Sequence, residues 1–213
     1  MEREVKISVI TLGDSGVGKT SIIKRIYDGT FQDVMFSTFG IGDFFVRRKY
    51  SKKNIQIVLC FKDTAGQESY QELPVQYIRK SHIVLLVFCD IETLNTLRER
   101  WYNFYKEKAN IENSRFILVG NKSDLFGNEK KEIERQGQEF ADEINAHFIT
   151  CSAKSKDNMD TLEQIIIDEA KNFIEIAENY IKERDNVQLN NQNNQNNTLN
   201  CILINSYILL DKK

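Results

Sequence analysis

The stretch GDSGVGKTS, residues 13–21, constrains this chain more than any other feature, and it follows directly on the apolar run VKISVITL. A GxxxxGK[ST] pattern between a strand and a helix is typical of a phosphate-binding loop. The backbone N–H groups of such a loop surround phosphate oxygens, and the positive end of the helix dipole favours the same anion. We expect Lys19 to reach the β- and γ-phosphates and the Thr20 hydroxyl to bind Mg²⁺. The loop alone does not distinguish ATP from GTP.

Apolar runs and helical patterns alternate along the chain. The runs HIVLLVF (82–88) and RFILVG (115–120) are apolar throughout, which predicts strands buried on both faces. Such alternation predicts an α/β fold with three layers: a mostly parallel six-stranded sheet with helices on both faces. The segment RRKYSKKNIQ (47–56) predicts a hairpin that makes one edge strand antiparallel. Further strands are expected at 5–12, 55–61 and 147–150, and helices after the phosphate loop, at 94–105, at 140–144 and at 162–177.

Two motifs select the base. NKSD, 121–124, follows the strand RFILVG, at the carboxyl end where ligands bind in an open α/β sheet. A carboxylate accepts from both the N1–H and the exocyclic amine of guanine, so Asp124 is the expected selector. Adenine lacks that donor pair and would leave Asp124 unpaired. CSAK, 151–154, follows the next strand, where the backbone N–H of Ala153 can meet the guanine O6. The sequence therefore predicts a guanine nucleotide.

KDTAGQE, residues 62–68, follows the strand at 55–61 and supplies the groups for hydrolysis. Asp63 is expected beside the phosphate loop, where it can hold the Mg²⁺ shell. Gly66 offers a backbone N–H to the γ-phosphate, and Gln67 can orient the attacking water. Thr38 lies upstream, in a loop that can close over Mg²⁺ when a γ-phosphate is present.

Length and composition exclude several classes of protein. A chain of 213 residues is large enough for one domain with a full core, and its net charge of −2 gives no electrostatic case for binding nucleic acid. The four cysteines are scattered without a CxxC pair, so neither zinc nor a disulfide framework is expected, as in a reducing, intracellular setting. The charged start MEREVK lacks the apolar core of a signal peptide. No apolar run is long enough for a membrane-spanning helix.

In these motifs the sequence resembles the Ras-like small GTPases and, within them, the Rab group, from about residue 5 to about residue 181. The resemblance implies a P-loop GTPase fold over 1–182, GTP/GDP and Mg²⁺ as cofactors, slow GTP hydrolysis and a switch in vesicle trafficking. It also implies a cytoplasmic monomer that acts at the cytosolic face of endomembranes, with an exchange factor, a GTPase-activating protein and effectors as partners. Phe31 should pack on the guanine ring, and Lys122 should cover its other face.

The resemblance and the motifs together give a full set of expected site residues. Gln67 is the expected catalytic residue, and Thr20, Thr38 and Asp63 are the expected Mg²⁺ ligands. The expected nucleotide-binding residues are Gly13, Ser15, Gly16, Val17, Gly18, Lys19, Thr20, Ser21, Phe31, Thr38, Asp63, Gly66, Asn121, Lys122, Asp124, Ser152, Ala153 and Lys154.

The chain also departs from the Rab pattern. Lys62 stands where Rab proteins usually place an aromatic residue of an apolar partner-binding patch, and the segment TFGIGDFF carries an extra residue near Gly42. We therefore expect a divergent Rab-like protein whose effectors differ from the usual ones. No arginine of this chain stands out as one that could reach the γ-phosphate. GTP hydrolysis by the protein alone should therefore be slow, and an arginine from a partner protein should accelerate it roughly 10³–10⁵-fold.

Three alternatives stay open at this point: a metabolic P-loop enzyme such as a nucleotide kinase, a guanine-nucleotide-binding scaffold that never cycles, and Ras- or Rho-like signalling.

The tail, residues 183–213, is rich in Asn and Gln and is expected to be disordered. Its Cys201 lies in CILI, which looks like a prenylation box but is followed by further residues. We expect no prenylation of the chain as written, and at most weak membrane association through the apolar patch 201–210.

Overall fold

The computed structural model describes residues 3–32, 41–64, 75–109 and 111–190. Six strands form one sheet in the order β2-β3-β1-β4-β5-β6. β2 and β3 pair antiparallel at one edge, and the other neighbouring strands pair parallel. This confirms the predicted mostly parallel sheet with one antiparallel edge strand. The strands are β1 (Arg3–Leu12), β2 (Ile41–Tyr50), β3 (Ile55–Thr64), β4 (Ile83–Phe88), β5 (Arg115–Gly120) and β6 (His147–Thr150).

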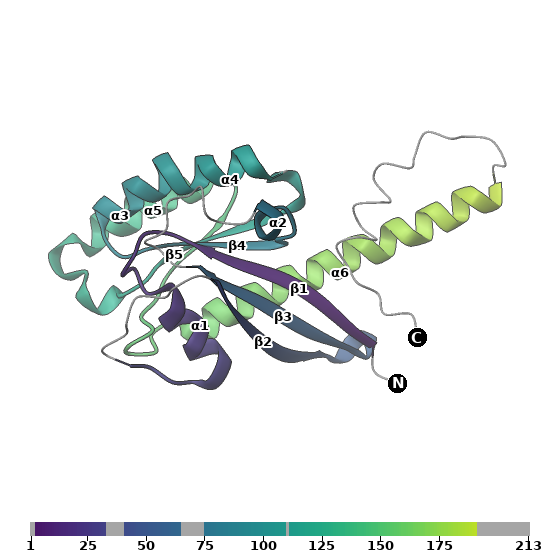
Figure 1. Ribbon diagram of the computed structural model, residues 1–213, viewed down its shortest axis with the longest axis horizontal. Coiled ribbons are helices and arrows are strands. Elements are labelled where there is room, and N and C mark those ends of the chain that lie inside the picture. The colour runs from purple at the N-terminus through teal and green to yellow at the C-terminus, as the bar shows by residue number, and fades with distance from the viewer. Residues whose placement is uncertain (1–2, 33–40, 65–74, 110, 191–213) are drawn as a thin grey trace.

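Helices cover both faces of the sheet, which confirms the three-layer arrangement (Figure 1). One face carries α1 and α6, and the other carries the remaining helices. The helices are α1 (Lys19–Asp28), α2 (Val75–Arg79), α3 (Ile91–Thr96), α4 (Asn103–Lys108), α5 (Lys130–Glu143) and α6 (Met159–Asn190). None of the helices in the described ranges has both the length and the apolar character needed to cross a bilayer.

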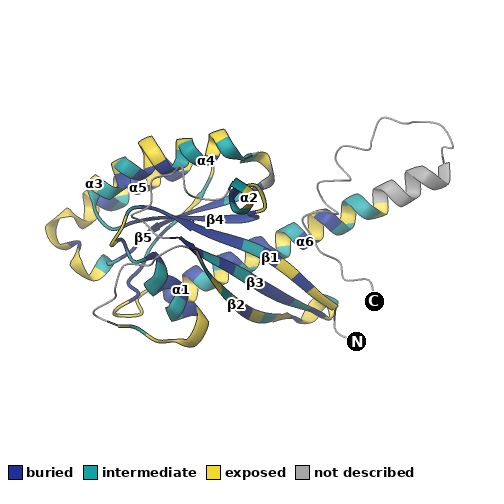
Figure 2. Cartoon of the chain, viewed as in Figure 1, coloured by how far each residue is buried: buried dark blue, intermediate teal, exposed yellow. Residues whose placement is uncertain are grey.

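Two hydrophobic clusters make up the core, one on each face of the sheet. The first packs α1 and α6 against residues such as Ile7 and Leu59, and the second packs α3 to α5 against residues such as Leu86 and Leu118. β4 is buried along its whole length, as its apolar sequence predicts. Figure 2 shows the buried strands between helices whose outer surfaces are exposed. The sheet thus lies between two hydrophobic clusters, and its carboxyl edge carries the loops that contain the motifs.

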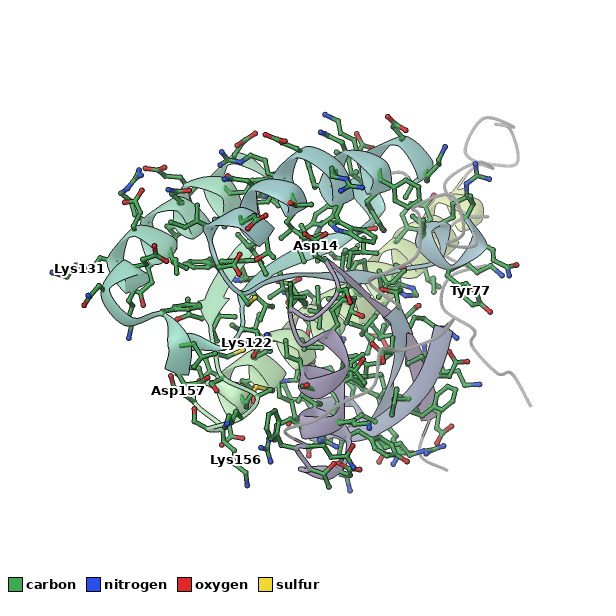
Figure 3. All side chains as sticks on the ribbon, turned by 60° about the vertical axis from the view of Figure 1, so that its left-hand side comes forward. Asp14, Tyr77, Lys122, Lys131, Lys156 and Asp157 are labelled. Carbon is green, nitrogen blue, oxygen red and sulfur yellow. The ribbon has the colours of Figure 1, made fainter. Side chains whose placement is uncertain are left out.

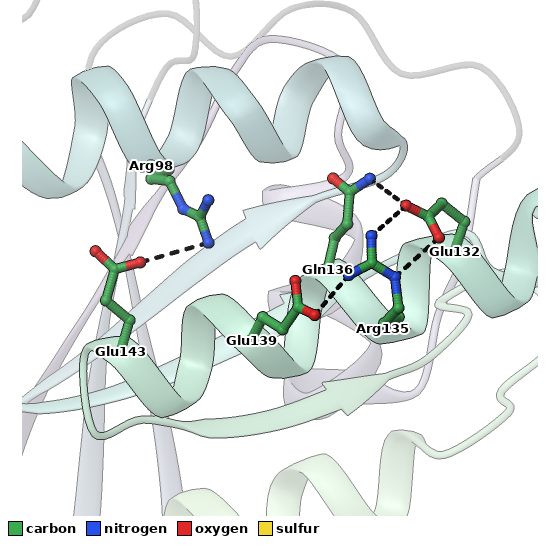
Figure 4. A network of polar contacts seen from close by, with 6 residues as sticks. All are labelled: Arg98, Glu132, Arg135, Gln136, Glu139 and Glu143. Atoms are coloured by element: carbon green, nitrogen blue, oxygen red, sulfur yellow. Dashed lines mark hydrogen bonds and ion pairs between the residues drawn. The ribbon is translucent and has the colours of Figure 1, made fainter.

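The helical pattern at 94–105 forms one continuous helical segment with an irregular centre. Asp90 caps its start, because its side chain accepts from the Thr93 N–H in a capping box. Between α3 and α4 lies a π-helical stretch, Leu97–Tyr102, that the sequence spacing did not predict. Arg98 from this stretch reaches Glu143 at the end of α5 at 3.4 Å, beside the exposed cluster around Arg135 (Figure 4). The segment thus packs directly on α5.

The hairpin predicted at 47–56 is present, and its register is regular. β2 and β3 pair without a break from Ile41 opposite Thr64 to Tyr50 opposite Ile55, so the extra residue near Gly42 causes no bulge within β2. β3 runs three residues beyond the predicted end, to Thr64, which places Asp63 within the strand. The side chain of Lys62, in β3, is held by two contacts. Its Nζ donates to Asp43 Oδ1 of the edge strand β2 at 2.6 Å and lies 4.9 Å from the Tyr77 ring centroid.

α6 extends beyond the expected domain boundary at residue 182 and ends at Asn190. The expectation of disorder is therefore wrong for residues 183–190. A helix that is already nucleated and docked propagates easily, because each further residue adds one hydrogen bond. α6 is docked on the hairpin by polar contacts, including Lys53 Nζ to Glu178 Oε2 at 2.6 Å and Tyr50 to Glu175. Residues 191–213, with Cys201, lie outside the described residues.

Candidate nucleotide-binding site

The phosphate loop joins β1 to α1 through two glycines that no other residue can replace without strain. Gly13 has φ +145° and Gly18 has φ +95°, both in the region that side chains disfavour. A Cβ on Gly13 would lie 2.1 Å from the Val87 carbonyl oxygen, and one on Gly18 would lie 2.2 Å from Asn121 Nδ2. The loop is therefore packed directly against the ends of β4 and β5. Its middle residues, Ser15 and Gly16, are exposed.

Lys19, the first residue of α1, is only 5% exposed. Its Nζ donates to the carbonyl oxygens of Gly13 and Asp14, each at 2.8 Å. Burial lowers the pKa of this amine to about 8, against the opposing charges of Asp63 and Asp14. The amine is thus held by the loop itself, at the start of the helix where an anion would be favoured.

Thr20 and Asp63 bring α1 and β3 together. The Thr20 hydroxyl donates to Asp63 Oδ2 at 2.7 Å. The other carboxylate oxygen, Oδ1, is buried and has no hydrogen-bond partner among the described residues. Burial raises the pKa of the Asp63 carboxyl above its usual value, opposed by the Thr20 hydrogen bond and the Lys19 charge. A buried acceptor without a donor is costly, and a cation would remove that cost.

A hydroxyl and a carboxylate are hard oxygen ligands of the kind that Mg²⁺ takes, together with phosphate oxygens and water. Within the described ranges there is no group of three or more His, Cys, Asp or Glu side chains that could hold a metal ion. Mg²⁺ needs no such group, because one or two carboxylates usually suffice when substrate phosphates supply the other oxygens. The pair Thr20 and Asp63 therefore fits this ion.

Asn121 links the three loops at the carboxyl edge. Its Nδ2 donates to the Val17 carbonyl at 2.8 Å, and its Oδ1 accepts from the Ala153 N–H at 3.1 Å. The side chain is 2% exposed, and its backbone N–H donates to the Phe88 carbonyl. The Ala153 N–H, expected to face the guanine O6, is thus engaged by Asn121 in this structure. Asn121 fixes the phosphate loop relative to the 151–154 loop.

Asp124 lies exposed in the short 3-10 turn Ser123–Leu125, after Lys122 in the left-handed conformation. It accepts a hydrogen bond from the Ser152 hydroxyl, and Ser152 Oγ accepts in turn from the Ser155 N–H at 3.0 Å. β5 and β6 are parallel neighbours, so the loops after them meet as predicted. In Figure 3, Asp14 and Lys122 lie near the centre of the view, which faces this edge of the sheet.

Two residues that the sequence analysis did not single out also build the site. Arg25 of α1 donates to the carbonyl oxygens of Ala153 (2.8 Å) and Lys154 (3.2 Å), and its guanidinium lies 5.5 Å from the centroid of the half-buried Phe31 ring. Trp101 donates to the carboxylate of Asp14 at 2.8 Å. Neither contact has a sequence signature, because each depends on how distant elements pack.

Most of the expected site residues that the structure describes lie together at the carboxyl edge. Thr38, Gly66 and Gln67 lie outside the described residues. Several expected residues are joined by hydrogen bonds, either directly or, for Ala153 and Lys154, through the side chain of Arg25. They are Gly13, Val17, Lys19, Thr20, Asp63, Asn121, Asp124, Ser152, Ala153 and Lys154.

This fold and this arrangement of loops define a P-loop nucleotide-binding protein of the small GTPase class. The family model described as the Ras family matches residues 8–172, and the chain belongs to the Ras family. It is 35% identical over 172 residues to the Ras-related protein RabC of Dictyostelium discoideum. The aligned region covers 78% of this chain and 85% of RabC.

Two fungal proteins give a similar result. The GTP-binding protein ypt1 of Schizosaccharomyces pombe is 33% identical over 75% of this chain and 77% of its own length. The Ras-related protein SEC4 of Candida albicans is 35% identical over 73% of each chain. The chain is therefore a divergent Rab-like small GTPase, an enzyme that hydrolyses GTP. This membership favours vesicle trafficking over the kinase, scaffold and signalling alternatives.

Proposed function

We propose that this protein is a GTP/GDP-controlled switch in intracellular vesicle trafficking whose nucleotide lies across the phosphate loop, the 121–124 loop and the 151–154 loop. The observation that carries the proposal is the pair of hydrogen bonds from Asn121 to Val17 and Ala153. These bonds join a phosphate-binding element to the elements expected to bind the base. One ligand with phosphates at one end and a base at the other matches that arrangement.

The phosphates would be held by the backbone N–H groups of residues 13–21, by the N-terminus of α1 and by Lys19. A helix N-terminus favours an anion, and α1 begins at Lys19 directly after the glycine turn. Lys19 already donates to two backbone oxygens, and a phosphate oxygen is a stronger acceptor for a charged amine. Ser15 and Ser21 flank this cradle.

Thr20 and Asp63, with Thr38 from the segment before β2, would hold Mg²⁺. A bound Mg²⁺ would supply positive charge that offsets the charge of the phosphates. The buried and unpartnered Asp63 Oδ1 supports this assignment, because a nearby cation or its water shell would satisfy it. The hydrogen bond from Thr20 to Asp63 keeps the two oxygen ligands adjacent.

Guanine would be selected by Asp124, whose carboxylate matches the donor pair at N1 and the exocyclic amine. Ser152 holds one Asp124 oxygen, which fixes the orientation of the carboxylate. Phe31 and Lys122 would cover the two faces of the base. Arg25 holds the Phe31 ring and the 151–154 loop in one unit, which supports a shared role.

Hydrolysis would depend on Gln67, which orients the attacking water, while Thr38 and the Gly66 N–H respond to the γ-phosphate. The segments around 32–45 and 66–80 would then differ between the GTP and GDP states, and partners would bind one state selectively. An exchange factor, a GTPase-activating protein and effectors are the partner kinds that family membership implies. The location that we propose for such a switch is the cytosolic surface of endomembranes.

A competition experiment with purified full-length protein tests the site. Unlabelled GDP should displace a fluorescent GDP analogue in the presence of Mg²⁺, whereas ATP at the same concentration should not. Displacement by ATP at similar concentration would contradict the assignment of Asp124.

Single-turnover GTP hydrolysis by wild type and Gln67→Leu tests the cycle. The variant should bind GTP as tightly as wild type but hydrolyse it more slowly. Equal hydrolysis rates would refute the role of Gln67.

A further inference from the structure

Trp101 is the only tryptophan of the chain and lies in the π-helical stretch between α3 and α4. Its side chain is 2% exposed and belongs to the hydrophobic cluster on that face of the sheet. π-helical turns within helices are rare and recur at functional sites, because the additional residue redirects the side chains around it. The local irregularity is therefore a reason to ask what Trp101 contacts.

The indole of Trp101 reaches the phosphate loop. Its Nε1–H donates to Asp14 Oδ1 at 2.8 Å, across a large distance in the sequence. A buried indole N–H needs an acceptor, and a carboxylate gives the stronger, charge-assisted form of the bond. The contact ties the second residue of the GDSGVGKTS loop to the helical layer on one face of the sheet.

Asp14 places a carboxylate in a loop that is proposed to bind a polyphosphate. Like charges at short range repel strongly where water is partly excluded, and Asp14 is half-buried. The same residue also serves Lys19, since its backbone carbonyl accepts from Lys19 Nζ at 2.8 Å. Movement of Asp14 would therefore disturb both the charge of the loop and the orientation of its lysine.

We propose that Trp101 is a positioning residue for the phosphate loop: its indole N–H holds the Asp14 carboxylate toward the α3–α4 helical layer, away from the bound phosphates. This inference rests on the proposed function of the loop. Without the indole N–H, the carboxylate is free to turn toward the nucleotide, and nucleotide release becomes faster. Trp101 acts through Asp14, so its effect depends on the presence of the Asp14 carboxylate.

A double-mutant cycle on the full-length protein tests this dependence. Release of a fluorescent GDP analogue is measured for wild type, Trp101→Phe, Asp14→Ala and the double variant, each loaded with nucleotide and Mg²⁺. Trp101→Phe retains an aromatic ring but has no N–H. With Asp14 present, it should speed release about tenfold, the range of one hydrogen bond to a charged group. With Ala at position 14, the same change should alter release less than about twofold.

The alternative is that Trp101 only fills the core. In that case Trp101→Phe changes release by the same factor in both Asp14 backgrounds, and the proposal is overturned. A wild-type protein that does not bind the GDP analogue at all would overturn the proposed site, and this proposal with it. Binding by wild type with equal effects in the two backgrounds would overturn only the role of Trp101.

A second measurement does not require Trp101 to be replaced. Because the chain has one tryptophan, ¹⁵N labelling gives one indole N–H resonance that reports this bond directly. In GDP-loaded protein, exchange of the indole proton with solvent should be about tenfold faster in Asp14→Ala than in wild type. Asp14→Asn keeps an oxygen acceptor without the charge, so its exchange rate should lie between those of wild type and Asp14→Ala. Equal exchange in all three proteins would overturn the proposal.

Discussion

Asn121 Nδ2 donates a 2.8 Å hydrogen bond to the carbonyl oxygen of Val17, and so joins the loop after β5 to the phosphate loop. Both residues are buried, and the amide oxygen of Asn121 is used at the same time by the Ala153 N–H. A buried side chain whose donor and acceptor are both committed cannot be replaced without leaving a partner unsatisfied. Asn121 therefore determines how the two halves of the site lie relative to each other.

Asn121→Asp tests this relationship with an almost unchanged shape. The Asp side chain retains an oxygen for the Ala153 N–H but presents a second oxygen, in place of a donor, to the Val17 carbonyl. We expect a loss of about 1–3 kcal/mol in the free energy of unfolding, measured with denaturant, and faster GDP release. Asn128→Asp, in the exposed turn Gly127–Glu129, introduces the same charge and should stay within about 0.5 kcal/mol of wild type. Equal losses in the two variants would contradict the role of Asn121.

Asp124→Asn should change the base that is bound. The amide no longer accepts from both guanine donors, so GDP affinity should fall by about ten- to a hundredfold, the range of a lost charge-assisted bond. Xanthine carries a carbonyl at C2 that accepts from the new amide, so xanthosine diphosphate should bind more tightly than GDP. Equilibrium titration with both nucleotides checks this. Asp142→Asn, on the far end of α5, is the charge-matched control and should leave the preference for guanine unchanged.

The sequence predicted the sheet, its antiparallel edge and the meeting of the loops because these follow from patterns along the chain. Buried strands such as β4 and β5 are apolar throughout, and motifs that directly follow parallel strands must meet at one edge. Family membership is likewise carried by short local motifs. These parts of the structure needed no knowledge of packing.

The contacts of Arg25 and Trp101 could not be predicted in this way. Arg25 binds backbone carbonyl oxygens, which every residue has, so the sequence contains nothing that marks its partners. Trp101 lies in a π-helical stretch and donates to Asp14, a residue far away in the sequence, and the regular spacing of apolar residues does not indicate either feature. The extension of α6 to Asn190 depends on docking along the hairpin, which local composition does not reveal.

Cys151 should be the least reactive of the three described cysteines. Burial raises the pKa of its thiol to about 12, so at pH 8 only about one molecule in 10⁴ carries the reactive thiolate. Cys60 and Cys89 are only half-buried. Iodoacetamide with peptide mass spectrometry should modify Cys151 in unfolded protein but at least about tenfold more slowly than Cys60 in native protein. The rate at Cys151 should rise as pH increases from 8 to 10. Rapid native labelling of Cys151 at pH 8 would show that the 151–154 loop opens frequently.

Arg25→Lys should weaken the unit formed by α1, Phe31 and the 151–154 loop. Arg25 donates to the carbonyl oxygens of Gly29, Ala153 and Lys154, and a single ammonium group cannot reach all three because it lacks the planar fork. We expect the free energy of unfolding to fall by about 1–2 kcal/mol, and GDP release to become several-fold faster as the loop loosens.

Arg98→Lys is the matched control for this prediction. Arg98 pairs with Glu143 at 3.4 Å, and both side chains are exposed (Figure 4). Its guanidinium also lies 4.8 Å from the centroid of the Phe140 ring, a contact that the ammonium group of Lys can still make. Exposed ion pairs contribute little, so this variant should lose less than about 1 kcal/mol and release GDP at the wild-type rate. Denaturant unfolding and release of a fluorescent GDP analogue measure both quantities. If Arg25→Lys and Arg98→Lys released GDP equally fast, the backbone contacts of Arg25 would have no specific role in the site.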